Sequence, residues 1–162
     1  MRKFNFKSRK GVTLISLAFT IVVILILTSI IVYNIPDYIQ TKKLKDLQND
    51  IQVIKENVMN YYARYNSVPG SIKYEWSVNA DKTYYIVDLQ ALEALSLTYG
   101  QKGYDAYKNV RSAITGGTIT AAQIQELNAI TDIFVFDVET LDVYYVEGIT
   151  LDGVTYYTYN GN

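Results

Sequence analysis

The sequence predicts an α+β fold, in which a long N-terminal helix packs on a small C-terminal antiparallel β-sheet of three to four strands. Three observations lead to this prediction. A stretch without charged residues runs from Gly11 through Pro36. After it, apolar residues recur at steps of three and four, the spacing of one helix face. The last thirty residues change to short β-branched and aromatic runs, which are typical of strands.

The stretch from Val12 to Tyr33 is apolar enough to cross a membrane, because its only polar side chains are those of Thr, Ser and Tyr. Twenty residues of α-helix rise about 30 Å, which is the thickness of the hydrocarbon core of a bilayer. A buried core helix is the alternative, but such a helix seldom runs this far without a charge. We therefore expect a transmembrane helix over residues 12–35.

Charge is distributed unevenly along the chain, although its formal net charge is only −1. Five of the fifteen Lys and Arg residues lie in the first ten positions. By the positive-inside rule, the N-terminus stays in the cytoplasm and about 125 residues are exported. We therefore expect a single-pass membrane protein whose C-terminal domain lies outside the cytoplasm.

The helix is predicted to continue as an amphipathic half over residues 36–66. Its apolar stripe comprises Leu44, Leu47, Ile51, Ile54 and Val58. Such a stripe lies along one face of a helix. Asn66, Pro69 and Gly70 are typical of a helix end. Two partners compete for this stripe: the sheet of its own domain, and the helices of other copies in a fibre.

Residues 67–132 are expected to form a connecting region with short helices. Asp88 precedes a run with leucines at helical spacing, which predicts a short helix with Asp88 as its N-cap. The sequence Thr120-Ala-Ala-Gln123 has the spacing of a capping box and predicts a second helix from Ala121 to Ile130. The aromatic and β-branched residues 83–87 favour a short strand.

Residues 133–162 are predicted to form an antiparallel β-meander. Its strand-like runs are residues 133–138, 143–149 and 154–159. Asp152-Gly153 is a hairpin turn signal, because Gly accepts a positive φ and Asp bonds its own backbone. The apolar helix stripe can cover one face of this sheet, which would give two packed layers, helix on sheet.

The composition excludes several kinds of catalytic and metal site. The chain has no Cys and no His, so Cys nucleophiles, Ser-His-Asp triads and Cys/His zinc sites are excluded. The cations of the middle region are scattered singly or in pairs among acids, which argues against a nucleic-acid partner; they are Lys73, Lys82, Lys102, Lys108 and Arg111. We expect no enzyme activity and no catalytic, cofactor-binding or metal-binding residue.

The acidic residues near the C-terminus lack calcium-loop spacing and are expected to form a solvated face; they are Asp132, Asp137, Glu139, Asp142, Glu147 and Asp152.

The junction Lys10-Gly11-Val12-Thr13-Leu14-Ile15-Ser16-Leu17 resembles the class III leader of bacterial type IV pilins and type II secretion pseudopilins. A basic leader, the Gly and the Thr-Leu-Ile run all match the family pattern. The resemblance implies that residues 1–11 are a leader, which a prepilin peptidase removes between Gly11 and Val12. Val12 stands where Phe is usual, and the resemblance makes its new amino group the site of N-methylation.

Ser16 is the larger departure, because it stands where the family carries a Glu at the assembly position. In the family, that carboxylate is thought to pair with the amino terminus of a neighbouring subunit. Subunits that lack it are minor pilins, including the tip subunit of secretion pseudopili. The resemblance therefore implies a minor or tip subunit. The alternative is that Ser16 is a tolerated variant in a fibre held mainly by apolar packing.

Taken as a whole, the resemblance implies a type IV pilin-like fold and a structural subunit of a type IV pilus or a type II secretion pseudopilus. Such subunits form a homo- or hetero-polymer at the cell surface or in the periplasm. The implied partners are the prepilin peptidase, an assembly ATPase, a platform membrane protein and sibling pilins. The alternative is an uncleaved, single-span membrane-anchored protein with an extracytoplasmic binding domain.

Overall fold

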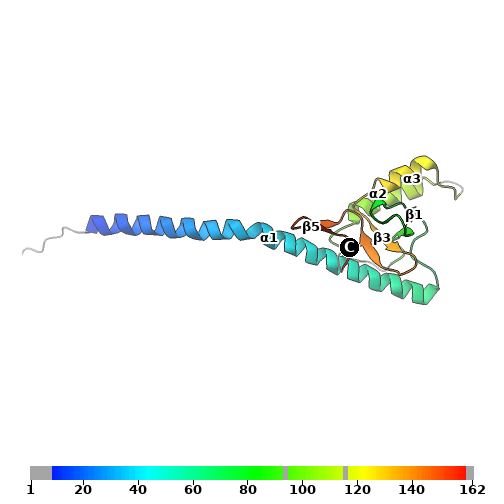
Figure 1. Cartoon of the computed structure of the whole chain (residues 1–162), viewed down its shortest axis with the longest axis horizontal. Helices are drawn as coiled ribbons and strands as arrows, with labels where there is room; N and C mark the ends of the chain where they lie inside the picture. The colour runs from blue at the N-terminus through cyan, green and yellow to red at the C-terminus, as the bar shows by residue number, and fades with distance from the viewer. Residues whose placement is uncertain (1–8, 93–94, 115–116, 160–162) are drawn as a thin grey trace, which may run out of the picture. The chain divides into compact units, whose positions relative to one another are not determined.

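The structure is a computed structural model that describes residues 9–92, 95–114 and 117–159, with side chains left out for 9–15, 29–37 and 79. Its fold is α+β, as predicted. The chain divides into two compact units, Met1–Gln40 and Thr41–Asn162. Helix α1 (Arg9–Tyr65) begins in the first unit and ends in the second (Figure 1). Residues 1–8 of the predicted leader lie outside the described residues.

The second unit is built on an antiparallel sheet of four strands in the order β1-β2-β3-β4. Tyr85 lies opposite Phe136 in one pair of strands, and Val135 lies opposite Tyr144 in the next. A separate hairpin of two strands follows the sheet. In chain order, the elements of this unit after α1 are β1 (Lys73–Tyr74), η1 (Ser77–Asn79), β2 (Tyr84–Ile86), α2 (Gln101–Ser112), α3 (Ala121–Asn128), β3 (Phe134–Asp137), β4 (Val143–Tyr145), β5 (Ile149–Leu151) and β6 (Val154–Tyr156).

One face of the sheet is covered by the apolar stripe of α1, as predicted. Four of its five predicted residues, Leu47, Ile51, Ile54 and Val58, are at most 1% exposed. They pack in one cluster with the β3 and β4 side chains Phe134, Phe136, Val143 and Tyr145. Leu44 is only partly buried. Within the second unit, the sheet of its own domain is therefore the partner of the stripe.

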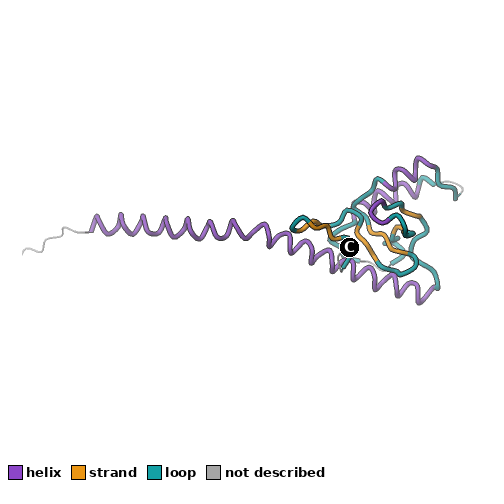
Figure 2. Tube along the Cα trace, in the orientation of Figure 1, coloured by secondary structure: helices purple, strands orange, loops and turns teal. Residues whose placement is uncertain are grey.

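The opposite face of the sheet is covered by α2 and α3, so the second unit has three layers (Figure 2). The predicted two-layer arrangement is wrong in this respect. Side chains alternate along a strand, and β3 shows the consequence. Phe134 and Phe136 face α1, whereas Val135 packs with Tyr107 of α2 and Leu127 of α3. All four residues of β3 are buried, as expected for a strand that is covered on both faces.

The predicted helix ends are confirmed at two positions. Helix α1 stops at Tyr65, and Asn66 follows it with φ of 49°, the left-handed conformation that Asn tolerates at helix ends. Helix α3 begins with the predicted capping box. The Thr120 hydroxyl accepts a hydrogen bond from the backbone N–H of Gln123, and the Gln123 side chain accepts one from the Thr120 N–H.

The predicted helix after Asp88 is wrong. In the described residues 88–92 and 95–97 the chain forms a turn and then an irregular segment. Asp88 does accept a hydrogen bond from the N–H of Gln90, but only one turn follows. The leucines of this run pack as an irregular segment onto the α1 side of the core. Their helical spacing therefore reflects burial and not helix formation.

Helix α2 was not predicted, because its sequence is a weak helix signal. It contains Gly103, which disfavours a helix interior, and its buried residues are two tyrosines and a valine. The structure explains the glycine. A Cβ at Gly103 would lie 1.8 Å from the carbonyl oxygen of Asp132. Gly103 therefore allows α2 to approach the start of β3 closely.

The predicted meander is confirmed for its first two strands and wrong for the third. The run 143–149 breaks after Tyr145, where Gly148 adopts φ of 70° and its N–H bonds the carbonyl of Tyr145. A Cβ at Gly148 would lie 2.6 Å from the methyl carbon of Thr155. The chain therefore leaves the sheet, and β5 pairs only with β6 across the predicted Asp152-Gly153 turn.

Replacing Ile54 by Ala should lower the free energy of unfolding of the second unit by about 2–5 kcal/mol, because it leaves a cavity between α1 and the sheet. Urea unfolding of the full chain in detergent can be followed by the fluorescence of Trp76, the only Trp in the sequence. Asn49→Ala, at an exposed position of the same helix, is the matched control. Equal losses in both variants would contradict the packing described here.

Candidate functional site

The predicted processing junction, Lys10, Gly11 and Val12, lies in the first turn of α1. The structure describes its backbone as helical, and its side chains lie outside the described residues. The cleavage and methylation assigned to these three residues stay predictions. Ser16, the predicted assembly position, is the first residue of the helix whose side chain is described, and it is exposed.

The helix segment 16–28, which we call the apolar segment, is exposed along its whole length. Large apolar side chains such as Leu17, Phe19 and Leu25 are 60% or more exposed. Successive residues of a helix differ by about 100° in direction, and seven consecutive positions, 21–27, are exposed apolar residues. The segment is therefore apolar on every side. A helix of this kind requires a surrounding apolar environment.

Two hydroxyl groups in the apolar segment are satisfied within the helix itself. The Thr20 hydroxyl donates to the carbonyl of Leu17 at 2.8 Å, and the Thr28 hydroxyl donates to the carbonyl of Ile24 at 2.6 Å. A buried hydroxyl without a partner would cost free energy in an apolar environment. Because these two have partners already, neither hydroxyl would be left without one if apolar groups surrounded the segment.

Within the described residues, no helix is both long and apolar enough to cross a membrane. The predicted span covers residues 12–35, and the side chains of 12–15 and 29–35 lie outside the described ones. The transmembrane assignment stays a prediction.

In the second unit, the outer edge of β1 is blocked by the end of α3. The side-chain oxygen of Asn128 accepts a hydrogen bond from the N–H of Glu75, just after β1. The hydroxyl of Tyr74 donates to the carbonyls of Asn128 and Ile130. Edge strands with unpaired backbone groups pair readily with other chains. These contacts occupy a donor that an added strand would need.

The outer edge of β4 is blocked by the chain that follows β6. The N–H of Tyr145 donates to the carbonyl of Tyr157 at 2.8 Å. The hydroxyl of Thr158 donates to the carbonyl of Val143 at 3.1 Å. One backbone N–H just after β1 and two backbone groups of β4 are therefore already bound by the chain itself, which disfavours strand addition at these positions.

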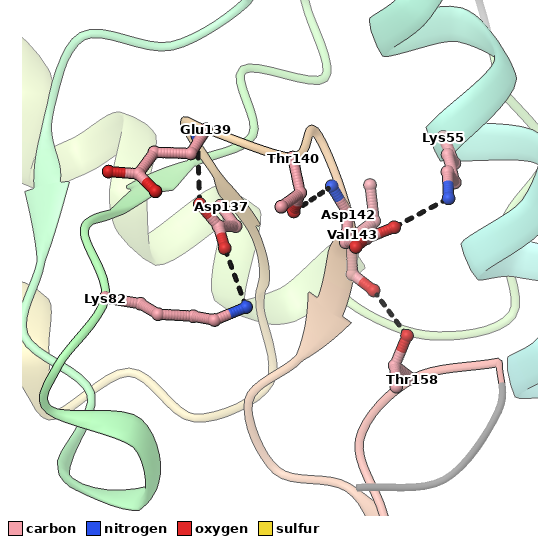
Figure 3. A network of polar contacts seen from close by, with 8 residues as sticks. All are labelled: Lys55, Lys82, Asp137, Glu139, Thr140, Asp142, Val143 and Thr158. Atoms are coloured by element: carbon pink, nitrogen blue, oxygen red, sulfur yellow. Dashed lines mark hydrogen bonds and ion pairs between the residues drawn. The ribbon is translucent and has the colours of Figure 1, made fainter.

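A polar network holds the β3–β4 turn in place (Figure 3). Lys82, in the loop before β2, forms an ion pair with Asp137 at 2.9 Å. Lys55 of α1 forms an ion pair with Asp142 at 2.6 Å. The N–H of Glu139 donates to Asp137, and the N–H of Asp142 donates to the hydroxyl of Thr140. Charged groups from three separate elements therefore fix one tight turn.

Asp137 is the buried member of this network, with 2% of its side chain exposed. Burial by itself would raise the pKa of Asp137. The hydrogen bonds from Lys82 and from the N–H of Glu139 outweigh burial and hold this pKa below its ordinary value. The ion pair in turn raises the pKa of Lys82. Both groups are charged at neutral pH, so the contact is an ion pair and not a neutral hydrogen bond.

Asp50 of α1 is a second buried carboxylate, and the sequence analysis missed it. It is 2% exposed and accepts hydrogen bonds from the N–H groups of Thr98 and Tyr99, at 2.7 and 2.9 Å. Burial raises the pKa of Asp50, against the effect of these two hydrogen bonds. Its position next to the stripe residue Ile51 was the available signal, because an acid beside an apolar stripe is often buried with a partner.

The prediction of a solvated acidic face near the C-terminus is wrong for three of its six residues. Asp137 and Asp142 form the ion pairs of the turn. Asp132 accepts hydrogen bonds from the N–H of Gly100 and the hydroxyl of Tyr145. The other three, Glu139, Glu147 and Asp152, are exposed as predicted. The error arose because the fold brings partners from distant parts of the chain, which the sequence pattern does not reveal: Lys55, Lys82 and the N–H of Gly100.

In the part of the chain that the structure describes, no group of three or more acidic side chains is placed to hold a metal ion. No family model, curated protein or solved structure matches this chain.

The second unit should lose stability in acid through Asp88, Asp137 and Asp142, whose pKa values are all lowered in the fold. Groups of this kind stabilise the fold above their unfolded pKa of about 3.8 and lose that effect as the pH falls through the folded value. Asp50 acts in the opposite direction, because its pKa is raised. Unfolding free energy measured between about pH 7 and pH 2 should therefore fall most steeply below about pH 4.

Lys82→Met isolates the part that Asp137 contributes. At pH 7 this variant should lose roughly 1–3 kcal/mol, since it leaves a buried carboxylate without its cation, and its stability should fall less between pH 4 and pH 2. Lys102→Met, at an exposed lysine without an ion pair among the described residues, should keep the acid slope of the wild type. An unchanged slope in Lys82→Met would show that the ion pair does not hold the Asp137 pKa down.

Proposed function

We propose that this chain is a pilin-like structural subunit of a type IV pilus or a type II secretion pseudopilus. In this proposal it enters the membrane with its N-terminus in the cytoplasm and is cleaved between Gly11 and Val12. It then leaves the bilayer and joins a helical filament. There, one surface of the subunit binds the preceding copy and a different surface binds the next copy. The second unit is carried outside the cytoplasm.

The exposed apolar segment carries the proposal. At residues 16–28 the helix presents apolar side chains in every direction. Each Å² of such surface removed from water is worth about 25 cal/mol. Two environments can provide this burial for one chain: a lipid bilayer before assembly, and the helices of neighbouring subunits after it. Both are needed by a subunit that is first a membrane protein and later part of a fibre.

The second unit supports the same division of roles. Its helix stripe is already buried against its own sheet, so Ile51, Ile54 and their neighbours are not available to other copies. The sheet edges are also covered by the chain itself. A subunit with these properties joins its neighbours through the N-terminal part of α1. Repeated contacts between two different surfaces of one subunit generate an open helical fibre.

Ser16 supports the finer assignment to a minor or tip subunit. A Glu at this position would need a partner for its charge inside an apolar core. A serine needs none, because its hydroxyl can bond a carbonyl of its own helix. A subunit at a filament end has no neighbour on one side, so the absence of this Glu suits that place. The proposed partners are a prepilin peptidase, an assembly ATPase, a platform membrane protein and sibling pilins.

The proposal makes a covalent prediction. Intact-mass measurement of the protein extracted from membranes of cells with an active prepilin peptidase should show a chain that starts at Val12. The Gly11→Leu variant should keep its first eleven residues, because the leaders that this junction resembles end in Gly. Ala18→Leu, an apolar enlargement in the same helix away from the junction, should be cleaved normally.

The same measurement separates the two candidate functions. A wild-type chain that keeps Met1 in such cells would favour the uncleaved membrane-anchored protein with an extracytoplasmic binding domain. A chain that is cleaved but never co-sediments with any polymer would contradict the structural role. Equal processing of Gly11→Leu and the wild type would show that the junction is not read as a leader site.

A further inference from the structure

Three exposed lysines gather at the beginning of the second unit. Lys42, Lys43 and Lys45 lie within four residues of α1, and all three side chains are exposed. Asp46 follows them directly, and Asp50 is one turn further on. The carboxylate of Asp50 is turned to the backbone of Thr98 and Tyr99. The cluster is therefore a local concentration of positive charge on an exposed helix surface.

The cluster differs from the other cations of the second unit, most of which have a carboxylate partner. Lys55, Lys82, Lys108 and Arg111 each form an ion pair with an aspartate. Among the residues that the structure describes, Lys42, Lys43 and Lys45 form none. This is notable because residues 41–162 contain fifteen Asp and Glu but only ten Lys and Arg. Partners are plentiful in the unit, yet these three lysines are left to solvent.

Their place in the sequence suggests what they face. Lys42 follows residue 35, the end of the predicted span, by seven residues, which is about 10 Å of α-helix. The headgroup layer beyond each side of the hydrocarbon core is only several Å deep. A lysine side chain is long and flexible, and charge acts over a Debye length of about 8 Å at physiological salt. The three ammonium groups can therefore reach the phosphates of the membrane surface.

Cations on this side of a span also run against the positive-inside rule, which favours lysines on the cytoplasmic side. A charge that opposes the insertion preference needs another reason to be there. Clustered lysines beside a membrane attract anionic headgroups, and each lysine adds to that attraction. A scattered arrangement would give solubility equally well but would not concentrate charge at one level.

We infer that Lys42, Lys43 and Lys45 bind the anionic headgroups of the outer leaflet and hold the subunit at the membrane surface before assembly. The interaction is electrostatic and has no defined pocket, so it selects anionic over zwitterionic lipid and weakens with salt. It opposes extraction and is released when the subunit leaves the bilayer. This inference rests on the membrane anchoring in the proposed function, and the experiment below separates the two.

The test inserts the full chain from detergent into vesicles of phosphatidylcholine, with or without phosphatidylglycerol. Brief acetylation of lysines followed by mass spectrometry then measures the reactivity of each residue. In phosphatidylglycerol vesicles, Lys42, Lys43 and Lys45 should be acetylated several-fold more slowly than in pure phosphatidylcholine. Lys73 and Lys102 are exposed and isolated, and they have no ion pair within the described part of the chain, so their rates should be equal in both. The protection should disappear at 0.5 M NaCl.

A competition between the two kinds of vesicle provides a second readout that needs no modification. The wild-type chain, offered both at once, should be enriched several-fold in the anionic vesicles. The triple variant Lys42→Gln, Lys43→Gln, Lys45→Gln should lose most of this enrichment, and the matched variant Lys73→Gln, Lys102→Gln should keep it. Enrichment that survives the triple substitution would assign the effect to the N-terminal cations and overturn the inference.

The outcomes distinguish this inference from the proposed function. A chain that inserts into both vesicles, with equal lysine reactivity in each, would overturn the lipid contact and leave the membrane anchor intact. A chain that associates with neither vesicle would overturn the anchor itself. Protection of Lys42, Lys43 and Lys45 that persists at high salt would also contradict the inference, because it would indicate a protein contact in place of an electrostatic lipid contact.

Discussion

Burial of the α1 stripe against β3 and β4 is the interaction on which the second unit depends. Leu47, Ile51, Ile54 and Val58 form the helical surface that covers the Phe134 and Phe136 side of the sheet. Once that face is covered by a helix from the N-terminal side of the sequence, the other face must be covered by α2 and α3. Strand β3 is then buried on both faces, so it becomes the centre of the unit. The short strands around it are stable because this central strand is.

The irregular parts of the unit are fastened by aspartates. Asp50, Asp88, Asp132 and Asp137 each accept a hydrogen bond from the backbone N–H of a loop residue. A domain with such short strands leaves many backbone donors outside the sheet, and each buried donor needs an acceptor. The chain has no Cys, so disulfides cannot fix these loops. Carboxylates are strong acceptors for N–H groups, and a short Asp side chain reaches a neighbouring loop without much loss of conformational entropy.

The parts that could be predicted from the sequence are those set by local pattern. The helix stripe, the end of α1 at Asn66, the capping box at Thr120 and the turn at Asp152 each depend on residues close together in the chain.

The errors lie where distant contacts decide the structure. The leucines after Asp88 have helical spacing, but the chain bends after them, where Asp50 binds the N–H groups of Thr98 and Tyr99. In the sequence, Gly148 lies in a strand-like run. In the fold, Thr155 and Tyr157 lie so close to it that no side chain fits there. Asp137 looks like a surface acid until Lys82 is brought beside it by the pairing of β2 with β3. Residues 1–8 and the side chains at the processing junction lie outside the described part of the chain. The leader and its cleavage therefore stay predictions.

The contacts around the second unit bear on how the subunit would assemble. Under the proposed function, a monomer that must not aggregate on the way to a fibre benefits from occupied sheet edges, and Asn128 and the chain after β6 bind backbone groups next to β1 and on β4. It also needs its amphipathic stripe satisfied internally, which the sheet achieves. Residues 21–27 form a continuous run of exposed apolar side chains. Under the proposed function, a membrane shields this run until partners replace the lipid. If the stripe or an edge strand were open as well, the subunit would have several competing ways to associate, and a single helical repeat would not be selected. Under the proposed function, association through one segment of α1 is therefore the condition that lets identical contacts repeat along a fibre.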